Sequence, residues 1–156
     1  MGLAKPGVIS GVVSLEGGYR FGSSRLWIHG QAIAGNAGDD QGSGHVYQGR
    51  AGIEARACWS VQLCSIAGVD LGGYRGTWVE DGFASGLTSE TIDALVATPR
   101  IAGEIGDRLR LRVGIELGLA VFGRSHRRIA GSDSDMDQSV SGPLNAEVML
   151  GLGYQW

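Results

Sequence analysis

The sequence predicts an all-β protein in which consecutive strands pair as an antiparallel up-and-down meander. Two observations carry this prediction. Apolar and polar residues alternate with a period of two in seven segments, and the connections between these segments are alternately short and long. Helical signals are nearly absent. Residues 89–96 could begin as a capped helix, but Pro99 and the continuing alternation favour a strand.

The seven expected strands cover residues 8–21, 25–35, 46–57, 64–78, 93–104, 107–123 and 144–156. The sixth is the clearest, because every second residue from Leu109 to Val121 is aliphatic. The positions between them include Arg108, Arg110 and Arg112. In a soluble sheet the aliphatic face would cover a core, whereas in a membrane barrel it would face lipid and the arginines would face the lumen. The alternation alone does not distinguish these two environments.

The connections and the strand lengths favour the membrane barrel. Short connections are expected at residues 22–24, 58–64 and 105–107, and long polar ones at residues 35–45, 79–92 and 124–143. Short turns at one end and long loops at the other are typical of outer-membrane barrels. Strands of about 11–15 residues are longer than the usual 5–6 and suffice to cross the hydrocarbon core. Aromatic residues lie near strand ends, as in interfacial girdles: Tyr19, Phe21, Tyr47, Trp78, Tyr154 and Trp156.

The composition fits one domain over residues 1–156. The net charge is −3, so we expect no nucleic-acid partner, which usually requires a basic face. No run of 18 apolar residues is present, so we expect no transmembrane helix. The N-terminal segment lacks the basic start and long apolar stretch of a signal peptide. For an exported protein, the signal is then expected to have been removed or to lie outside this chain.

The two cysteines, Cys58 and Cys64, flank a predicted turn with the sequence WSVQL. At the two ends of a hairpin loop they could form a disulfide in an oxidising compartment, which would indicate the periplasmic side. The alternative is a pair of reduced, small residues. A metal site is not expected here, because two cysteines without a nearby histidine supply too few ligands.

The polar face of the predicted strands is rich in ionisable residues, and its bases and acids nearly balance. An eight-stranded barrel is only wide enough for its side chains to fill, so we expect an ion-pair network that plugs the lumen. The alternative is the solvated outer face of a soluble sheet, where such pairs contribute little. The expected members are Glu16, Arg20, Arg25, Arg50, Glu54, Arg56, Asp70, Arg100, Glu104, Arg110, Arg112, Glu116 and Glu147.

The sequence offers no convincing catalytic, cofactor or metal site. Ser125 and His126 are adjacent, but neighbouring residues on a strand do not face one another, and no nucleophile motif surrounds them. We therefore expect a protein without enzymatic activity, although barrel enzymes that act on lipid exist. The basic residues 124–128, RSHRR, could contact lipopolysaccharide, because arginine pairs well with phosphate.

The closing residues LGLGYQW resemble the terminal strand of bacterial outer-membrane barrels, which ends on Phe or Trp. The whole layout, including CWSVQLCSIAGVDLGGYRG, is similar to small eight-stranded barrels of Gram-negative bacteria over residues 8–156. The resemblance implies an outer-membrane location and insertion by the barrel assembly machinery, which reads the C-terminal strand with its terminal Trp156. Such barrels have an even number of strands, so the seven readable strands suggest that a first strand is missing and the chain is N-terminally truncated. Alternatively, residues 1–7 fold back or a second copy of the chain closes the barrel.

The functional expectation is a non-enzymatic, integral outer-membrane protein with a side-chain-filled lumen and long surface loops. Its role would be structural or in surface contacts, and it would need no cofactor. The alternative is a soluble, lipocalin-like barrel that binds a small apolar ligand, which requires the aliphatic face to point inward.

Overall fold

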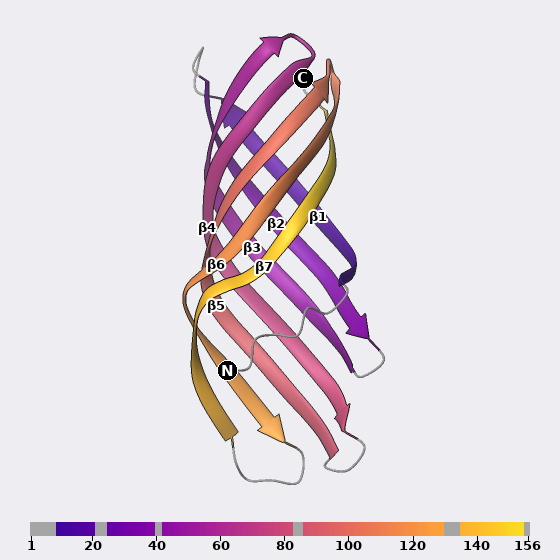
Figure 1. Ribbon diagram of the computed structural model, residues 1–156, viewed down its shortest axis with the longest axis vertical. Helices are drawn as coiled ribbons and strands as arrows, with labels where there is room; N and C mark the ends of the chain where they lie inside the picture. Colours follow the sequence, from indigo (N-terminus) through magenta and orange to yellow (C-terminus); the bar gives the residue numbers. More distant parts are fainter. Residues whose placement is uncertain (1–8, 21–24, 40–41, 83–85, 130–134, 155–156) are drawn as a thin grey trace.

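The computed structural model describes residues 9–20, 25–39, 42–82, 86–129 and 135–154 (Figure 1). All-β architecture is confirmed, because these residues form one seven-stranded antiparallel sheet in which each strand pairs with the next along the chain. No helix among them has the length and hydropathy that crossing a membrane requires. The strands are β1 (Ile9–Arg20), β2 (Leu26–Asp39), β3 (Gly42–Ser60), β4 (Leu63–Gly82), β5 (Gly86–Gly106), β6 (Leu109–Ile129) and β7 (Asp135–Tyr154).

The strands are longer than the sequence predicts. The prediction of three long loops is wrong for most of the residues assigned to them, because these residues belong to strands. Strand pairing continues to Asp39 opposite Gly42, and to Gly82 opposite Gly86. The RSHRR segment likewise belongs to β6, which pairs with β7 as far as Arg128. These segments are polar or rich in glycine and serine, so their apolar alternation is weak. The strands nevertheless continue through these segments, because backbone hydrogen bonds form whether or not the side chains alternate.

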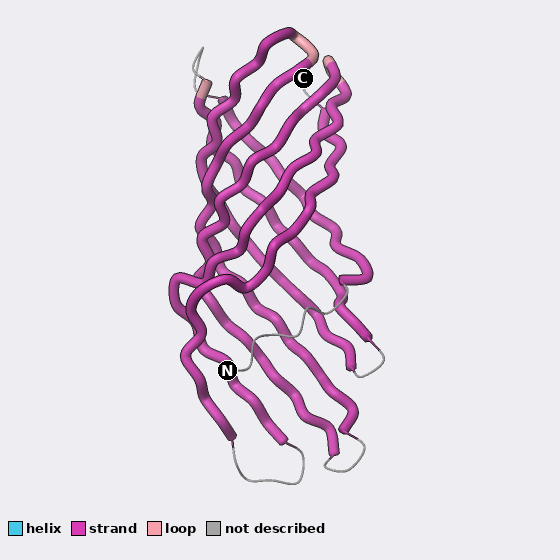
Figure 2. Tube along the Cα trace, viewed as in Figure 1, coloured by secondary structure: helices cyan, strands magenta, loops and turns pink. Residues whose placement is uncertain are grey.

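The sheet curls strongly about one concave side (Figures 1 and 2). Ion pairs cross the enclosed space: Glu16 on β1 lies 2.8 Å from Arg112 on β6 and 3.2 Å from Arg100 on β5. Among the described strands the ladder nevertheless has two free ends, because β1 pairs only with β2 and β7 pairs only with β6. The architecture is therefore a barrel-like but unclosed meander.

Side chains alternate between an inner face, on the concave side, and an outer face. The inner face carries buried ions, such as Glu54, which is 1% exposed, and Arg100, which is 2% exposed. The outer face carries exposed aliphatic residues, such as Ile101 at 71% and Val148 at 81%. This arrangement is the inverse of a soluble sheet, in which apolar residues are covered and ions face water.

The outer face changes from aliphatic to charged side chains along the strands, so we divide the sheet into two parts. The half that contains the short turns is called the turn half, and the rest is called the far half. The far half comprises residues 33–39, 42–48, 74–82, 86–94, 123–129 and 135–140. On the outer face, Arg75 on β4 lies opposite Asp93 on β5, which lies opposite Arg124 on β6. This charged row marks where the aliphatic outer surface of the turn half ends.

Irregular pairing concentrates near the border between the two halves. The register between β5 and β6 shifts at Leu95 and Val96, and that between β6 and β7 shifts between Ala120 and Gly123. Gly142 on β7 has a φ of 102°, a conformation that glycine adopts without strain. A register shift of this kind is a β-bulge, which bends a strand and increases its twist. Both β6 and β7 turn sharply near their middle (Figure 2).

Candidate functional site

The inner face of the turn half holds a single connected cluster of ion pairs, which we call the ion-pair network. Its arginines come from β3, β5 and β6, and its carboxylates come from β1, β3, β4, β5 and β6. The arginines are Arg50, Arg56, Arg100, Arg110 and Arg112, and the carboxylates are Glu16, Glu54, Asp70, Glu104 and Glu116. Among the described residues these charges balance, so the network buries ions without burying net charge.

Arg100 lies at the centre of the ion-pair network. Its guanidinium donates to Glu54 on β3, lies 3.2 Å from Glu16 on β1, and lies 3.8 Å from Glu116 on β6. The three carboxylates come from strands spread around the concave side, so this one side chain ties the curled sheet together. A buried ion of this kind is tolerated only when it is paired and hydrogen-bonded.

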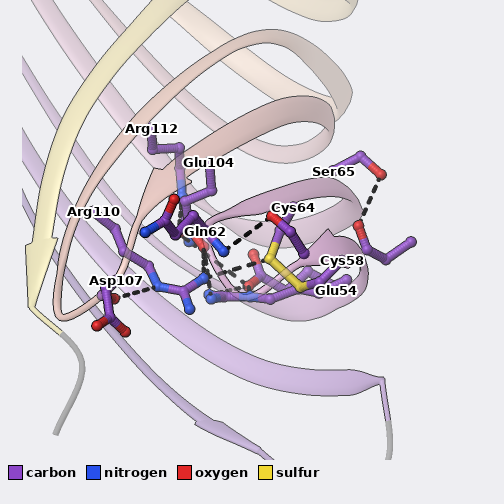
Figure 3. The surroundings of a disulfide bond; sticks show 12 residues. Glu54, Cys58, Gln62, Cys64, Ser65, Glu104, Asp107, Arg110 and Arg112 are labelled. Atoms are coloured by element: carbon purple, nitrogen blue, oxygen red, sulfur yellow. Dashed lines mark hydrogen bonds and ion pairs between the residues drawn. A yellow bond between two sulfur atoms is a disulfide. The ribbon is translucent and has the colours of Figure 1, made fainter.

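Toward the short turns, Glu104 accepts hydrogen bonds from three arginines (Figure 3). Arg56 and Arg110 each approach it to 3.1 Å, and Arg112 approaches it to 3.0 Å. The guanidinium of Arg56 also lies 4.1 Å from the ring centre of Trp27, in a cation–π contact. Glu104 and Arg56 are thus each held by more than one partner.

Toward the far half, Arg50 joins the network to two residues that the predicted set omits. Its Nε lies 3.3 Å from Asp70 and donates to the amide oxygen of Gln31 at 2.8 Å, and its Nη2 donates to Glu116. The Nε2 of His29 lies 2.7 Å from Asp70. The sequence signal for His29 and Gln31 was present, because both occupy the polar positions of the alternation in their strand.

Glycines make room for these large inner side chains. A Cβ on Gly72 would overlap the backbone oxygen of Gly49 and the side chain of Arg50, and a Cβ on Gly52 would overlap Asp70. Gly68 lies directly opposite Glu54, whose Cβ would be 3.0 Å from an added Cβ. A narrow lumen cannot accept a large side chain from every strand, so glycine and ions alternate around it.

Ten of the predicted network residues therefore meet in the structure, whereas Arg20 and Arg25 are exposed. Arg20 is exposed at the end of the edge strand β1, and Arg25 is exposed immediately before β2. Neither position is covered by strands on both sides. The side chain of Glu147 and the whole of Trp156 lie outside the described residues.

The predicted disulfide is confirmed. Cys58 and Cys64 are opposite one another in the β3–β4 hairpin, and their sulfur atoms are 2.06 Å apart. Cys64 is 1% exposed, and its sulfur lies 3.5 Å from the Nη1 of Arg110 (Figure 3). The bond thus closes the hairpin beside the turn-side end of the ion-pair network.

The adjacent residues Ser125 and His126 make separate contacts outside the network. Ser125 points inward and donates to Glu90 at 2.5 Å, whereas the adjacent His126 lies 2.7 Å from Asp137 on the outer face. The two side chains therefore do not form a nucleophile–base pair. Within the described ranges, no three His, Cys, Asp or Glu side chains are grouped in a way that could hold a metal ion.

Comparisons with models of known protein families, with curated proteins and with solved structures found no match to this chain.

Proposed function

We propose that this chain is an integral outer-membrane β-barrel protein of a Gram-negative bacterium, without enzymatic activity, whose turn half crosses the bilayer. Its ion-pair network fills the lumen, and its far half projects beyond the membrane as a structural or contact surface. The observation that carries the proposal is the exposed aliphatic outer face around an interior of buried ions. In water this arrangement would expose a large apolar surface, whereas in lipid that surface is solvated by acyl chains.

The height of the aliphatic surface fits a bilayer. On β5 it extends from Leu95 to Ile105, which matches the roughly 9–11 residues that a tilted strand needs to cross the hydrocarbon. The charged row of Arg75, Asp93 and Arg124 begins immediately beyond it. Such a sharp change from aliphatic to charged side chains is what the boundary between acyl chains and headgroups requires.

Barrel closure needs one strand beyond the seven described. In an antiparallel sheet of seven strands, the edges β1 and β7 run parallel to each other, so a single further strand can pair antiparallel with both. The hydrocarbon core does not tolerate unpaired strand edges. The proposal therefore includes a closing strand between β1 and β7.

The orientation follows from the turns and the disulfide. Short turns of outer-membrane barrels lie in the periplasm, an oxidising compartment in which a disulfide such as Cys58–Cys64 persists. The C-terminal end of β7 lies at the same end of the sheet, where Leu150, Leu152 and Tyr154 are exposed. We propose this strand as the segment that the barrel assembly machinery reads.

We also propose that residues at the charged row contact lipopolysaccharide. Arg124 is exposed there, and within the described part of the chain it has no ion-pair partner. His126 and Arg128 are exposed on the same outer face of β6. Guanidinium groups next to the aliphatic surface are well placed to pair with lipid phosphates.

The soluble, lipocalin-like alternative receives no support from this geometry. It requires the aliphatic residues of the turn half on the inner face, where ions lie instead. Val148, Leu150 and Leu152 on β7 are among the most exposed large apolar residues of the described chain.

A polarity-sensitive fluorophore tests membrane insertion. We would attach it to Ile101→Cys, on the outer face of the turn half, and to Val79→Cys, on the outer face of the far half, in protein folded into phosphatidylcholine vesicles. The emission is expected to shift to the blue only at residue 101. Water-like emission at both positions, or a chain that does not float with vesicles, would contradict the proposal.

Conductance in planar bilayers tests the filled lumen. The parent chain is expected to show no large, steady open channel, because the paired ions occupy the cross-section. Heat-modifiable gel mobility of the same sample verifies that the barrel is folded. A folded sample with a large, steady conductance would contradict the proposal that side chains fill the lumen. It would not contradict the proposal that the chain inserts into the membrane.

A further inference from the structure

A hollow of about 960 Å³ lies at the border of the two halves, where the aliphatic outer surface meets the charged row. Its volume is within the range of about 300–1,000 Å³ that is typical of small-molecule sites. Two adjoining rows of outer-face residues on β3, β4, β5 and β6 line it. These rows are Tyr47, Arg75, Asp93 and Arg124 toward the far half, and Gly49, Gly73, Leu95 and Phe122 toward the turn half.

The lining places the hollow on the outer face of the sheet. The remaining lining residues form the single inner row between the two outer rows, and they are Ile33, Gln48, Tyr74, Ala94 and Gly123. The next inner residues of β3 on either side, Val46 and Arg50, do not line it. A hollow on the concave side would touch these neighbouring inner rows, whereas a hollow on the outer face touches both outer rows and the backbone between them.

Two glycines form the floor of the hollow. Gly49 and Gly73 lie opposite one another on β3 and β4, and a Cβ built on either glycine would meet no atom within 4 Å. The space above them is therefore open on the outer face. Tyr47 and Phe122 are large, exposed side chains at the two ends of the hollow, on β3 and β6. The floor is thus a low, apolar place between larger apolar side chains.

The rim toward the far half carries one positive charge that is not balanced. Arg75 donates two hydrogen bonds to Asp93, of 2.6 Å and 3.0 Å, so the charges of these two residues cancel. Arg124 lies opposite Asp93 in the same row, and it has no ion-pair partner within the described part of the chain. A ligand with an anionic group beside an apolar group therefore complements both the rim and the floor.

From these observations we infer that the hollow is a binding site for one lipid molecule with an anionic phosphate headgroup. The phosphate pairs with Arg124, because guanidinium and phosphate form strong, charge-assisted hydrogen bonds. The adjoining part of one acyl chain lies over Gly49 and Gly73. The inference rests on the proposed function, since the hollow is continuous with the aliphatic surface that the proposed function places in lipid. An uncharged lipid would leave Arg124 unpaired, and free phosphate would leave the apolar floor uncovered.

Native mass spectrometry of the chain, folded in micelles of a neutral detergent, tests the site. The probe is dipalmitoyl phosphatidic acid, and saturable retention of one molecule per chain is expected. Dipalmitoylglycerol, which has the same acyl chains but no phosphate, and inorganic phosphate are each expected to bind roughly tenfold more weakly or less. Equal retention of the two lipids would contradict pairing of the phosphate with Arg124.

Two glycine variants test whether the lipid occupies the hollow. Gly73→Leu fills the floor and is expected to weaken the binding of phosphatidic acid by roughly tenfold or more. Gly103→Leu is the matched control, because an added Cβ there also meets no atom within 4 Å and the residue does not line the hollow. It is expected to bind as the parent chain does. Equal losses for the two variants would overturn the site.

Arg124→Gln keeps the inference falsifiable if Gly73→Leu does not fold. It is expected to weaken the binding of phosphatidic acid by roughly tenfold and to leave the retention of dipalmitoylglycerol unchanged, because only the phosphate contact is lost. Heat-modifiable gel mobility verifies that each variant is folded, and vesicle flotation reports separately on the proposed function. A chain that does not float contradicts the proposed function, whereas a chain that floats but retains no phosphatidic acid in micelles overturns the site alone.

Discussion

The two halves of the sheet share one backbone ladder, yet their outer faces differ: the outer face of the turn half is aliphatic, and that of the far half is largely polar. In the turn half, Ile115 and Val148 are exposed on the outer face while Glu116 is buried inside. In the far half, Arg75 and Asp93 are exposed outside while Ile33 is buried. A continuous strand therefore carries both outer patterns, and the change occurs within a few residues of the bulge in the β5–β6 pairing.

This difference shows that one continuous antiparallel ladder can carry two different outer surfaces. Antiparallel pairing is indifferent to which face is apolar, because the backbone supplies its hydrogen bonds. Under the proposed function, lipid surrounds the turn half and water surrounds the far half. Each half then turns toward its surroundings the side chains that those surroundings solvate best, and four predictions would break or sharpen this comparison.

The largest effect is expected from Arg100→Leu in the turn half. The substitution leaves Glu16, Glu54 and Glu116 without their shared partner in a buried interior, at a cost of about 3–5 kcal/mol in the free energy of unfolding. Arg124→Leu, at an exposed site in the far half, is expected to change it by less than about 0.5 kcal/mol. Urea unfolding in vesicles, followed by tryptophan fluorescence, measures both. Similar values for the two variants would remove the distinction between the halves.

Introducing arginine on the outer face is expected to have the next largest effect. Ile115→Arg places a charge in the aliphatic surface near its middle and is expected to cost about 2–4 kcal/mol and to block insertion. Val79→Arg introduces the same side chain on the exposed outer face of the far half and is expected to insert normally. Vesicle flotation and heat-modifiable gel mobility are the measurements. Equal insertion of both variants would show that lipid does not surround the turn half.

A neighbouring pair of glycines separates the crowded inner face from the open outer face. Gly72→Ala places a methyl group against Arg50 and the backbone of Gly49, and overpacking of this kind costs about 1–3 kcal/mol. Gly73→Ala meets no atom within 4 Å and is expected to change stability by less than about 0.5 kcal/mol. Unfolding curves of both variants test this. Equal destabilisation would mean that the inner face is not tightly packed.

The smallest effect is expected from pH in the far half. The hydrogen bond from Arg75 lowers the pKa of Asp93 below its ordinary value of 3.8. A lowered pKa in the folded state means that the pair stabilises the fold above the ordinary pKa and loses this contribution as the pH falls toward the folded-state value. Both side chains are exposed, so solvent screening keeps the contribution small.

The measurement for this pair is the urea midpoint between about pH 5 and pH 3. The parent chain is expected to lose slightly more stability over this interval than Asp93→Asn, which has no carboxylate to protonate. Other carboxylates titrate in both proteins, so only the difference between the two slopes is informative. Indistinguishable slopes at low salt would mean that the pair does not stabilise the far half.

Much of the candidate site could be read from the sequence because a period of two assigns each residue to a face. That rule correctly placed Arg50, Glu54 and Arg100 on one side of the sheet, and it also held for His29, which was left out of the predicted network. It did not reveal that Arg20 and Arg25 are exposed, because alternation assigns a face but does not show that a position at a strand end or sheet edge is uncovered.

By itself, the sequence determined the all-β meander, the seven strands and the alternation of ions with aliphatic residues, because these follow from local periodicity and turn residues. It also indicated the Cys58–Cys64 bond, whose partners are brought together by a short hairpin. Only the tertiary structure decided how far the strands extend, which ions meet across the concave side and where the aliphatic outer surface ends. These features depend on strand curvature and on contacts between residues far apart in the chain, such as Glu16 and Arg112, and local patterns do not encode them.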